Sequence, residues 1–150
     1  MKTNNALQKN GFHFGLNVIA AVLTVLAMAA YVVGASVFSY YDDLNVVVLL
    51  LAAMGAVAAL LAATIAKRTG DTLLTALLGI VASVLLTACI MLIVEARVYS
   101  FAVLMLSDLE RDNVDGYHAL YSSMAAVGTL LASVGCIVAS GFVSAKKKEL

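Results

Sequence analysis

The chain has 150 residues, of which 63% are hydrophobic and 12% are charged, and its formal net charge is zero. This composition, with a mean hydropathy of +1.03, excludes a water-soluble globular domain, because the polar residues are too few to cover the surface of a folded chain. The sequence therefore predicts an integral membrane protein, with lipid as the surrounding solvent.

The first apolar stretch, residues 14–38, predicts a transmembrane helix. A bilayer core of about 30 Å needs roughly 20 helical residues, and this stretch exceeds that number. The alternative is a cleaved signal peptide, whose apolar part usually has about 7–15 residues. The nearest approach to a cleavage site is Ser36 between Ala35 and Val37, and no clear small-x-small motif precedes the loop 40–43. We therefore assign this stretch as the first span.

Three further apolar stretches lie at residues 45–66, 72–94 and 118–143. In lipid every backbone N–H and C=O needs an internal partner, so a span is either a helix or a strand of a closed barrel. These stretches lack the alternating apolar and polar residues of a barrel strand, which leaves helices. The predicted fold is a single all-α domain, an integral membrane four-helix bundle with up-down-up-down topology.

The four spans differ in length. Residues 45–66 are close to the minimum for a span at 1.5 Å per residue, whereas the first and fourth stretches have residues to spare. The third helix would be about 50 Å long if it ran from Thr72 to Ser107, because no proline interrupts it. We expect helices 1, 3 and 4 to be extended on the extracytoplasmic side, with a helix extension and loop over residues 95–117.

The basic residues separate the two sides of the membrane, because positively charged flanks are retained in the cytoplasm. The two termini and the loop between the second and third spans hold seven of the nine Lys and Arg residues: Lys2, Lys9, Lys67, Arg68, Lys146, Lys147 and Lys148. Both termini are therefore predicted to be cytoplasmic, in a multi-pass protein of the cell membrane. The C-terminal lysine run is typical of a topology signal and a contact with anionic lipid, and it does not indicate nucleic-acid binding.

The segment 98–106 is apolar, yet it follows Glu95 and Arg97 on the side where the chain is expected to be in water. Four interpretations stay open: a helix extension packed against helices 1 and 4, an interfacial segment, a partner-binding surface, or a lower helix 3 that draws both charges into the bilayer. The candidate residues for partner binding or coupling are Glu95, Arg97, Tyr99, Phe101, Asp108, Tyr117 and His118.

The loop before the fourth span contains two weak motifs. Ser107 and Glu110 have the S-x-x-E spacing of a capping box, which would begin a short helical turn. The acidic and amide residues around Gly116 are similar to a calcium loop, but that register places Arg111 at the first ligand position and Ser122 at the bidentate glutamate position. We therefore expect a solvated acidic turn and no metal site.

The spans lack the chemistry of an enzyme. Cys89 and Cys136 should differ in depth by about 10 Å along the bundle, so we expect no disulfide between them. His13 and His118 fall at opposite membrane edges and cannot share a metal ion. The sequence has no G-x-S-x-G, H-E-x-x-H, P-loop or dinucleotide motif. We expect neither catalysis nor a cofactor.

Small residues recur four positions apart in the second and fourth spans. Such residues line up on one helix face and let another helix approach closely. We expect them to pack within the bundle, with dimerisation as the alternative. The helix-packing residues are Gly55, Ala59, Gly128, Ala132, Gly135 and Ala139.

These observations favour a non-enzymatic accessory or interaction subunit. It would bind a membrane protein, an extracytoplasmic protein or another copy of itself through an acidic, tyrosine-rich extracytoplasmic cap. The alternative is a small dimeric transporter or channel that uses Glu95, since ionisable residues within a membrane often mark a transport pathway. Lipid is the one partner that the composition requires.

Overall fold

A computed structural model describes residues 2–37, 44–69, 73–107 and 112–145, with side chains over 12–36, 44–69, 73–107 and 112–142. Helix α1 spans Lys2–Val32 and continues as a short π-helix, η1, over Val33–Val37. The remaining elements are helices α2 (Val46–Thr69), α3 (Leu73–Leu106) and α4 (Val114–Ala145).

All four helices are long and apolar enough to cross a membrane. The predicted helical membrane protein is confirmed to this extent, and the described residues contain no strand. Helix α3 is the longest, with 34 residues. It continues without a break through 98–106, the apolar segment for which the sequence allowed four interpretations.

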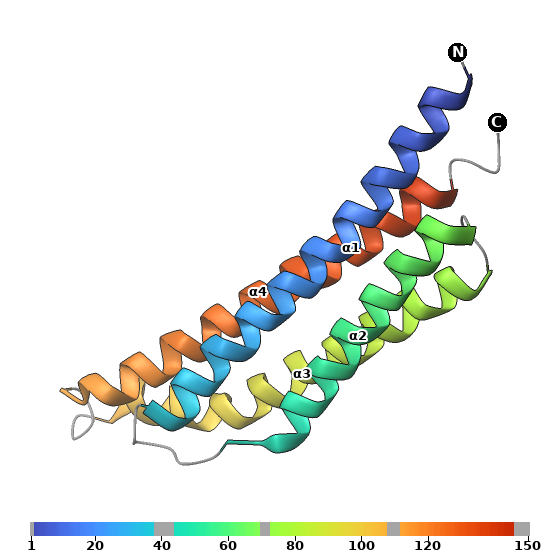
Figure 1. Cartoon of the computed structure of the whole chain (residues 1–150). Helices are drawn as coiled ribbons and strands as arrows, with labels where there is room; N and C mark the ends of the chain where they lie inside the picture. Colours follow the sequence, from blue (N-terminus) through green and yellow to red (C-terminus); the bar gives the residue numbers. More distant parts are fainter. Residues whose placement is uncertain (1, 38–43, 70–72, 108–111, 146–150) are drawn as a thin grey trace.

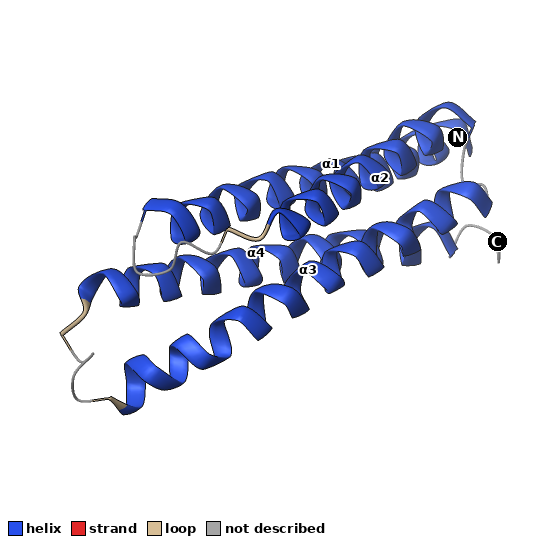
Figure 2. Cartoon of the chain, turned by 90° about the horizontal axis from the view of Figure 1, so that it is seen from below, coloured by secondary structure: helices blue, strands red, loops and turns tan. Residues whose placement is uncertain are grey.

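The helices lie side by side along one axis (Figures 1 and 2). Helix α1 packs against α2 and α4, and α3 packs against the same two helices. The beginning of α1 and the end of α4 lie at the same end of the bundle (Figure 1). We call this the basic end, because Lys67 Nζ lies there, 4.9 Å from the centre of the Phe14 ring. The distal end is the opposite one, where α3 ends and α4 begins.

Helix α2 packs against α3 through small residues. Gly55 and Ala59 lie on its buried face, and Leu86 of α3 is fully buried. A Cβ atom at Gly55 would lie 2.7 Å from Leu86 Cδ2. The backbone of α2 therefore approaches α3 so closely that a side chain at this position would displace Leu86.

Buried polar side chains join α1 to α4. The interhelical hydrogen bonds are Asn17 Nδ2 to Ser140 Oγ at 3.1 Å, Thr24 Oγ1 with Ser133 Oγ at 2.9 Å, and Ser122 Oγ to the Ala30 carbonyl at 2.6 Å. Bonds of this kind contribute on average about 0.6 kcal/mol each in a membrane. Because they are spaced along the whole interface, they fix the register of the two helices.

The π-helical turn η1 lies against the distal part of α4. A Cβ atom at Gly34 would lie 3.0 Å from Ser122 Cβ, so the two backbones are close at this point. A π turn shifts the backbone hydrogen bonds by one residue, and Ser122 supplies an additional donor to the carbonyl of Ala30. The first span therefore ends in a wider turn that is fitted to α4.

Tyr31 connects α1 to the beginning of α2. This tyrosine is buried, and its hydroxyl accepts a hydrogen bond from the Asn45 backbone N–H at 3.0 Å. Asn45 is also the N-cap of α2, since its side-chain oxygen accepts from the Val47 N–H at 2.9 Å. One short polar link thus positions the α1–α2 connection relative to the bundle.

The small residues of α4 correct one prediction. Gly128, Ala132, Gly135 and Ala139 are all exposed, and the space around a Cβ at either glycine is open to 4 Å. The expectation that they pack inside the bundle is wrong, because the face that they share is turned outward. The spacing aligned these residues correctly on one face but did not specify its direction. Dimerisation through them stays a prediction.

Gly55→Leu is expected to destabilise the bundle, because the new side chain would force α2 away from Leu86. Over-packing of this kind costs typically about 1–3 kcal/mol. Thermal unfolding in mild detergent, followed by circular dichroism, measures the effect. The matched control is Gly135→Leu, which adds the same side chain in open space and should leave the midpoint nearly unchanged. Equal losses in both variants would contradict the close α2–α3 contact.

Candidate functional site

Asn113 begins helix α4 as its N-cap. Its Oδ1 accepts a hydrogen bond from the Gly116 N–H at 3.0 Å, which satisfies one of the free donors of the first turn. Asp115 lies in the same turn, where the helix dipole favours a negative charge. The sequence analysis missed this cap, although an asparagine directly before an apolar run is a known helix-start signal.

Tyr117 fastens the beginning of α4 to the end of α3. Its hydroxyl donates to the Leu104 carbonyl at 3.1 Å. A Cβ atom at Gly116 would lie 2.8 Å from Leu104 Cδ2, so α4 passes close to this side chain. The ring of Tyr121 lies beside Tyr117, with centroids 6.4 Å apart. Among the interpretations of segment 98–106, a helix extension packed against α4 matches these contacts.

Arg97 and Glu95 lie on different faces of α3, since two residues are separated by about 200° around a helix axis. Arg97 is only 6% exposed, and its Nε donates to Ser123 Oγ of α4 at 3.0 Å. The Ser123 hydroxyl in turn donates to the Ala119 carbonyl at 3.0 Å. Glu95 is exposed. The charged side chain that enters the protein here is therefore the arginine.

The predicted site residues do not form one cluster. Tyr99 is 75% exposed and lies one turn beyond Glu95 on the same face of α3. Phe101 lies with Arg97 along a groove that faces α4. His118 is exposed on α4. Asp108, like Glu110 and Arg111 of the predicted loop motifs, lies outside the described residues.

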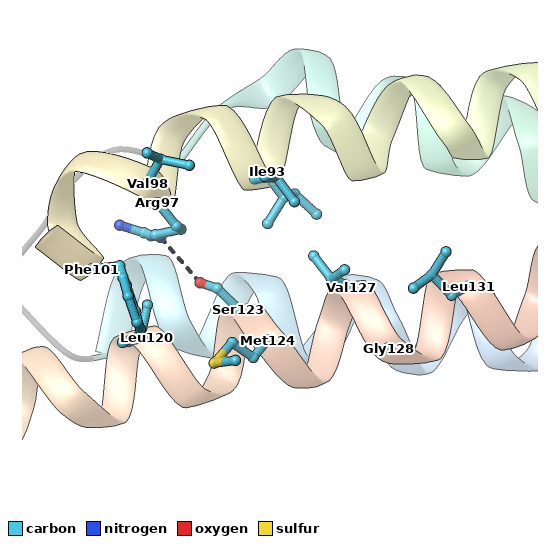
Figure 3. A pocket seen from close by; sticks show the side chains of 11 residues that line it. Ile93, Arg97, Val98, Phe101, Leu120, Ser123, Met124, Val127, Gly128 and Leu131 are labelled. Carbon is cyan, nitrogen blue, oxygen red and sulfur yellow. Dashed lines mark hydrogen bonds between the residues drawn. The ribbon is translucent and has the colours of Figure 1, made fainter.

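The groove between α3 and α4 has a volume of about 390 Å³. Figure 3 shows its walls, which are apolar apart from the hydrogen-bonded pair Arg97 and Ser123. Val98, Met124 and Leu131 line it and are each more than half exposed. The groove therefore opens sideways, toward the surroundings of the bundle. The sequence analysis missed it, because it depends on how the two helices face each other.

The two cysteines and His13 are buried or half-buried in the bundle. Both cysteines are free thiols, and Cys89 Sγ donates to the Val48 carbonyl at 3.4 Å. His13 is buried near the basic end, where its Nδ1 lies 3.3 Å from Asn17 Nδ2. Among the residues with a described placement, no group of three or more His, Cys, Asp or Glu side chains is arranged to hold a metal ion.

Comparisons with models of protein families, with curated proteins and with solved structures find no match to this chain. The four-helix arrangement alone does not define a function, because bundles of this kind serve many roles. The function must be inferred from the side chains of this protein.

Tyr117→Phe is expected to loosen the distal ends of α3 and α4 by removing the donor to the Leu104 carbonyl. A hydrogen bond of this kind contributes about 0.5–1.5 kcal/mol, so amide exchange over 104–120 should accelerate roughly two- to tenfold. Hydrogen–deuterium exchange in nanodiscs measures the rate. Tyr121→Phe is the control, because Tyr121 is exposed, and it should exchange at the wild-type rate. Equal acceleration in both variants would contradict this link.

Proposed function

We propose that this chain is a four-span protein of the cell membrane with up-down-up-down topology and cytoplasmic termini, and that it acts as a non-enzymatic accessory or interaction subunit. Helix α3, with 34 residues, is about 51 Å long. The hydrocarbon core of a bilayer is about 30 Å thick. Roughly 20 Å of α3 is therefore left to extend beyond the core on the extracytoplasmic side.

The basic residues support this orientation. Lys67, at the end of α2, lies over the Phe14 ring of α1, and Arg68 follows it. The end of α4, which precedes the C-terminal lysines in the sequence, lies at the same end of the bundle (Figure 1). Since basic flanks are retained in the cytoplasm, the distal end faces the outside.

The main support for the proposed partner surface is the exposure of Tyr99. Tyr99 is 75% exposed and lies about 39 Å along α3 from Leu73, beyond the bilayer core. Tyr121 and Leu106 are also exposed at the distal end. Tyrosine is enriched among the residues that dominate protein interfaces. Glu95, one turn from Tyr99, adds a negative charge that favours a partner with a basic residue there.

The polar groups inside the bundle support a structural role for the spans. The hydroxyls of Thr24 and Ser133 lie within hydrogen-bond distance of each other and of the Ala20 carbonyl, so their two protons are used within this cluster. Asn17 bonds across the same interface to Ser140. The hydrogen bonds of these side chains join α1 to α4. Such bonds are expected in a scaffold whose distal end binds another protein.

The second candidate, a small dimeric transporter that uses Glu95, has one supporting observation. Glu95 and the small residues Gly128 and Gly135 are all exposed on a single chain. A second copy could therefore approach α4 closely. Because Glu95 is exposed on a single chain, it would be enclosed only in such a dimer. Glu95→Gln in proteoliposomes tests this candidate, since loss of proton-coupled flux would favour it.

A cysteine at position 95 is expected to react with a membrane-impermeant maleimide added to intact cells, because Glu95 is exposed near the outer edge of the bilayer. Cys89→Ala and Cys136→Ala remove the background thiols. A cysteine at Arg68 is the control and should react only after the cells are permeabilised. Labelling of position 68 but not 95 from outside would overturn the orientation. Protection of 95 with loss of flux in Glu95→Gln would favour the transporter.

A photo-crosslinking residue at Tyr99 is expected to capture one defined protein in native membranes, whereas the same residue at Val84, exposed in the middle of α3, should capture lipid. The captured protein should also co-purify with the unmodified chain, and Tyr99→Ala should weaken its binding at least about tenfold, as expected for an interface tyrosine. Capture of lipid alone at both positions would contradict the accessory role.

A further inference from the structure

The groove between α3 and α4 is about as long as one leaflet of the bilayer core is thick. Leu120 and Leu131, which line its two ends on α4, are about 16 Å apart along the helix axis, roughly half of the 30 Å core. Ser123 lies about 28 Å from Phe142 near the basic end. Arg97 lies about 36 Å along α3 from Leu73. The Arg97–Ser123 pair is therefore between the outer edge of the core and the outer headgroups, and the part of the groove lined by Val127, Gly128 and Leu131 lies inward from it.

The inner part of the groove has the surface of an acyl-chain site. Ile93, Val127 and Leu131 line its walls. Gly128 contributes no side chain, and a Cβ atom there would meet nothing within 4 Å. A lipid chain that enters the groove leaves an equally apolar environment, so it gains packing contacts but little hydrophobic free energy. Apolar walls alone would not select one lipid from the bilayer.

Arg97 supplies the selectivity. Basic side chains near a membrane edge usually extend toward water, whereas Arg97 is buried in the outer half of the groove and oriented by Ser123. A guanidinium has five N–H donors in a planar fork that matches phosphate, so it can bind phosphate oxygens while it keeps its other partners. At this depth the phosphates of the outer leaflet are the available anions.

We propose that this groove binds one anionic phospholipid of the outer leaflet, with its phosphate at Arg97 and one acyl chain along Ile93, Val127 and Gly128. A zwitterionic headgroup carries its own cation, which competes with the guanidinium for the phosphate, so a net negative lipid is preferred. This inference rests on the proposed transmembrane placement and is independent of a protein partner at Tyr99.

Native mass spectrometry of the purified chain in mild detergent, with equal amounts of phosphatidylglycerol and phosphatidylcholine, tests the site. We expect one retained phosphatidylglycerol and a preference of about tenfold, because the choline cation of phosphatidylcholine competes with Arg97 for the phosphate. Arg97→Gln keeps an amide donor but removes the charge, and it should abolish the preference. Arg68→Gln, which removes an exposed charge at the basic end, should retain it.

Gly128→Leu tests the acyl-chain part without a change of charge. The added side chain should fill the groove and reduce phosphatidylglycerol binding at least about tenfold, by removing the packing contacts of the chain. Gly135→Leu is the matched control, since Gly135 is also exposed in open space but does not line the groove. Circular dichroism establishes that each variant is folded. If Arg97→Gln does not fold, Gly128→Leu decides the question.

Four results would overturn the lipid site. One is equal retention of both lipids by the wild-type chain. The second is an unchanged preference in folded Arg97→Gln, and the third is unchanged binding in folded Gly128→Leu. The fourth is displacement of the lipid by millimolar inorganic phosphate, which would assign Arg97 to a free anion. Any of these leaves the Tyr99 crosslink standing, whereas the orientation fails separately if position 68 but not position 95 is labelled from outside.

Discussion

Helices in lipid gain little free energy by hiding apolar surface from one another, because the surrounding acyl chains are equally apolar. Their association depends on close backbone approach and on hydrogen bonds between polar side chains. This bundle uses both. Helices α1 and α4 are joined by pairs such as Asn17–Ser140 and Thr24–Ser133, and α2 meets α3 at the close contact of Gly55 with Leu86. These two interfaces hold the helices in two pairs, and the contact of α1 with α2, to which the Tyr31–Asn45 hydrogen bond belongs, joins the pairs.

The contact between α3 and α4 follows from those positions. The helices meet at the distal end through Tyr117 and Leu104 and, further in, through Arg97 and Ser123. Inward from the Arg97–Ser123 link, the groove opens beside Gly128. Small residues at one spacing therefore have opposite effects in this chain. In α2 they bring two backbones together, and in α4 they leave outward-facing space that a lipid or another helix can occupy.

The sequence predicts the spans well, because apolar length depends only on neighbouring residues. It predicts poorly which face of each helix is buried. In α2 and α4 alanine, glycine and large apolar residues occur on every side, so the pattern aligned Gly128 with Ala132 but did not show that both point outward. The caps Asn45 and Asn113 were recognisable from local signals and were missed. The pairing of Arg97 with Ser123 depends on the register of two helices, which no local pattern contains.

The burial of Arg97 is the feature that packing alone explains least well. A guanidinium removed from water carries a large desolvation cost, and at a membrane edge the long arginine side chain could avoid that cost by extending outward. Glu95, two residues earlier, is exposed as expected for a charge at this level. Arg97 instead lies 6% exposed between two helices, with Ser123 orienting its Nε. A fixed cation in the outer half of an apolar, sideways-open groove is complementary to an anionic amphiphile. An anionic lipid bound there would add charge-assisted hydrogen bonds to those that Arg97 already makes, and its chain would fill the space that Gly128 leaves in α4.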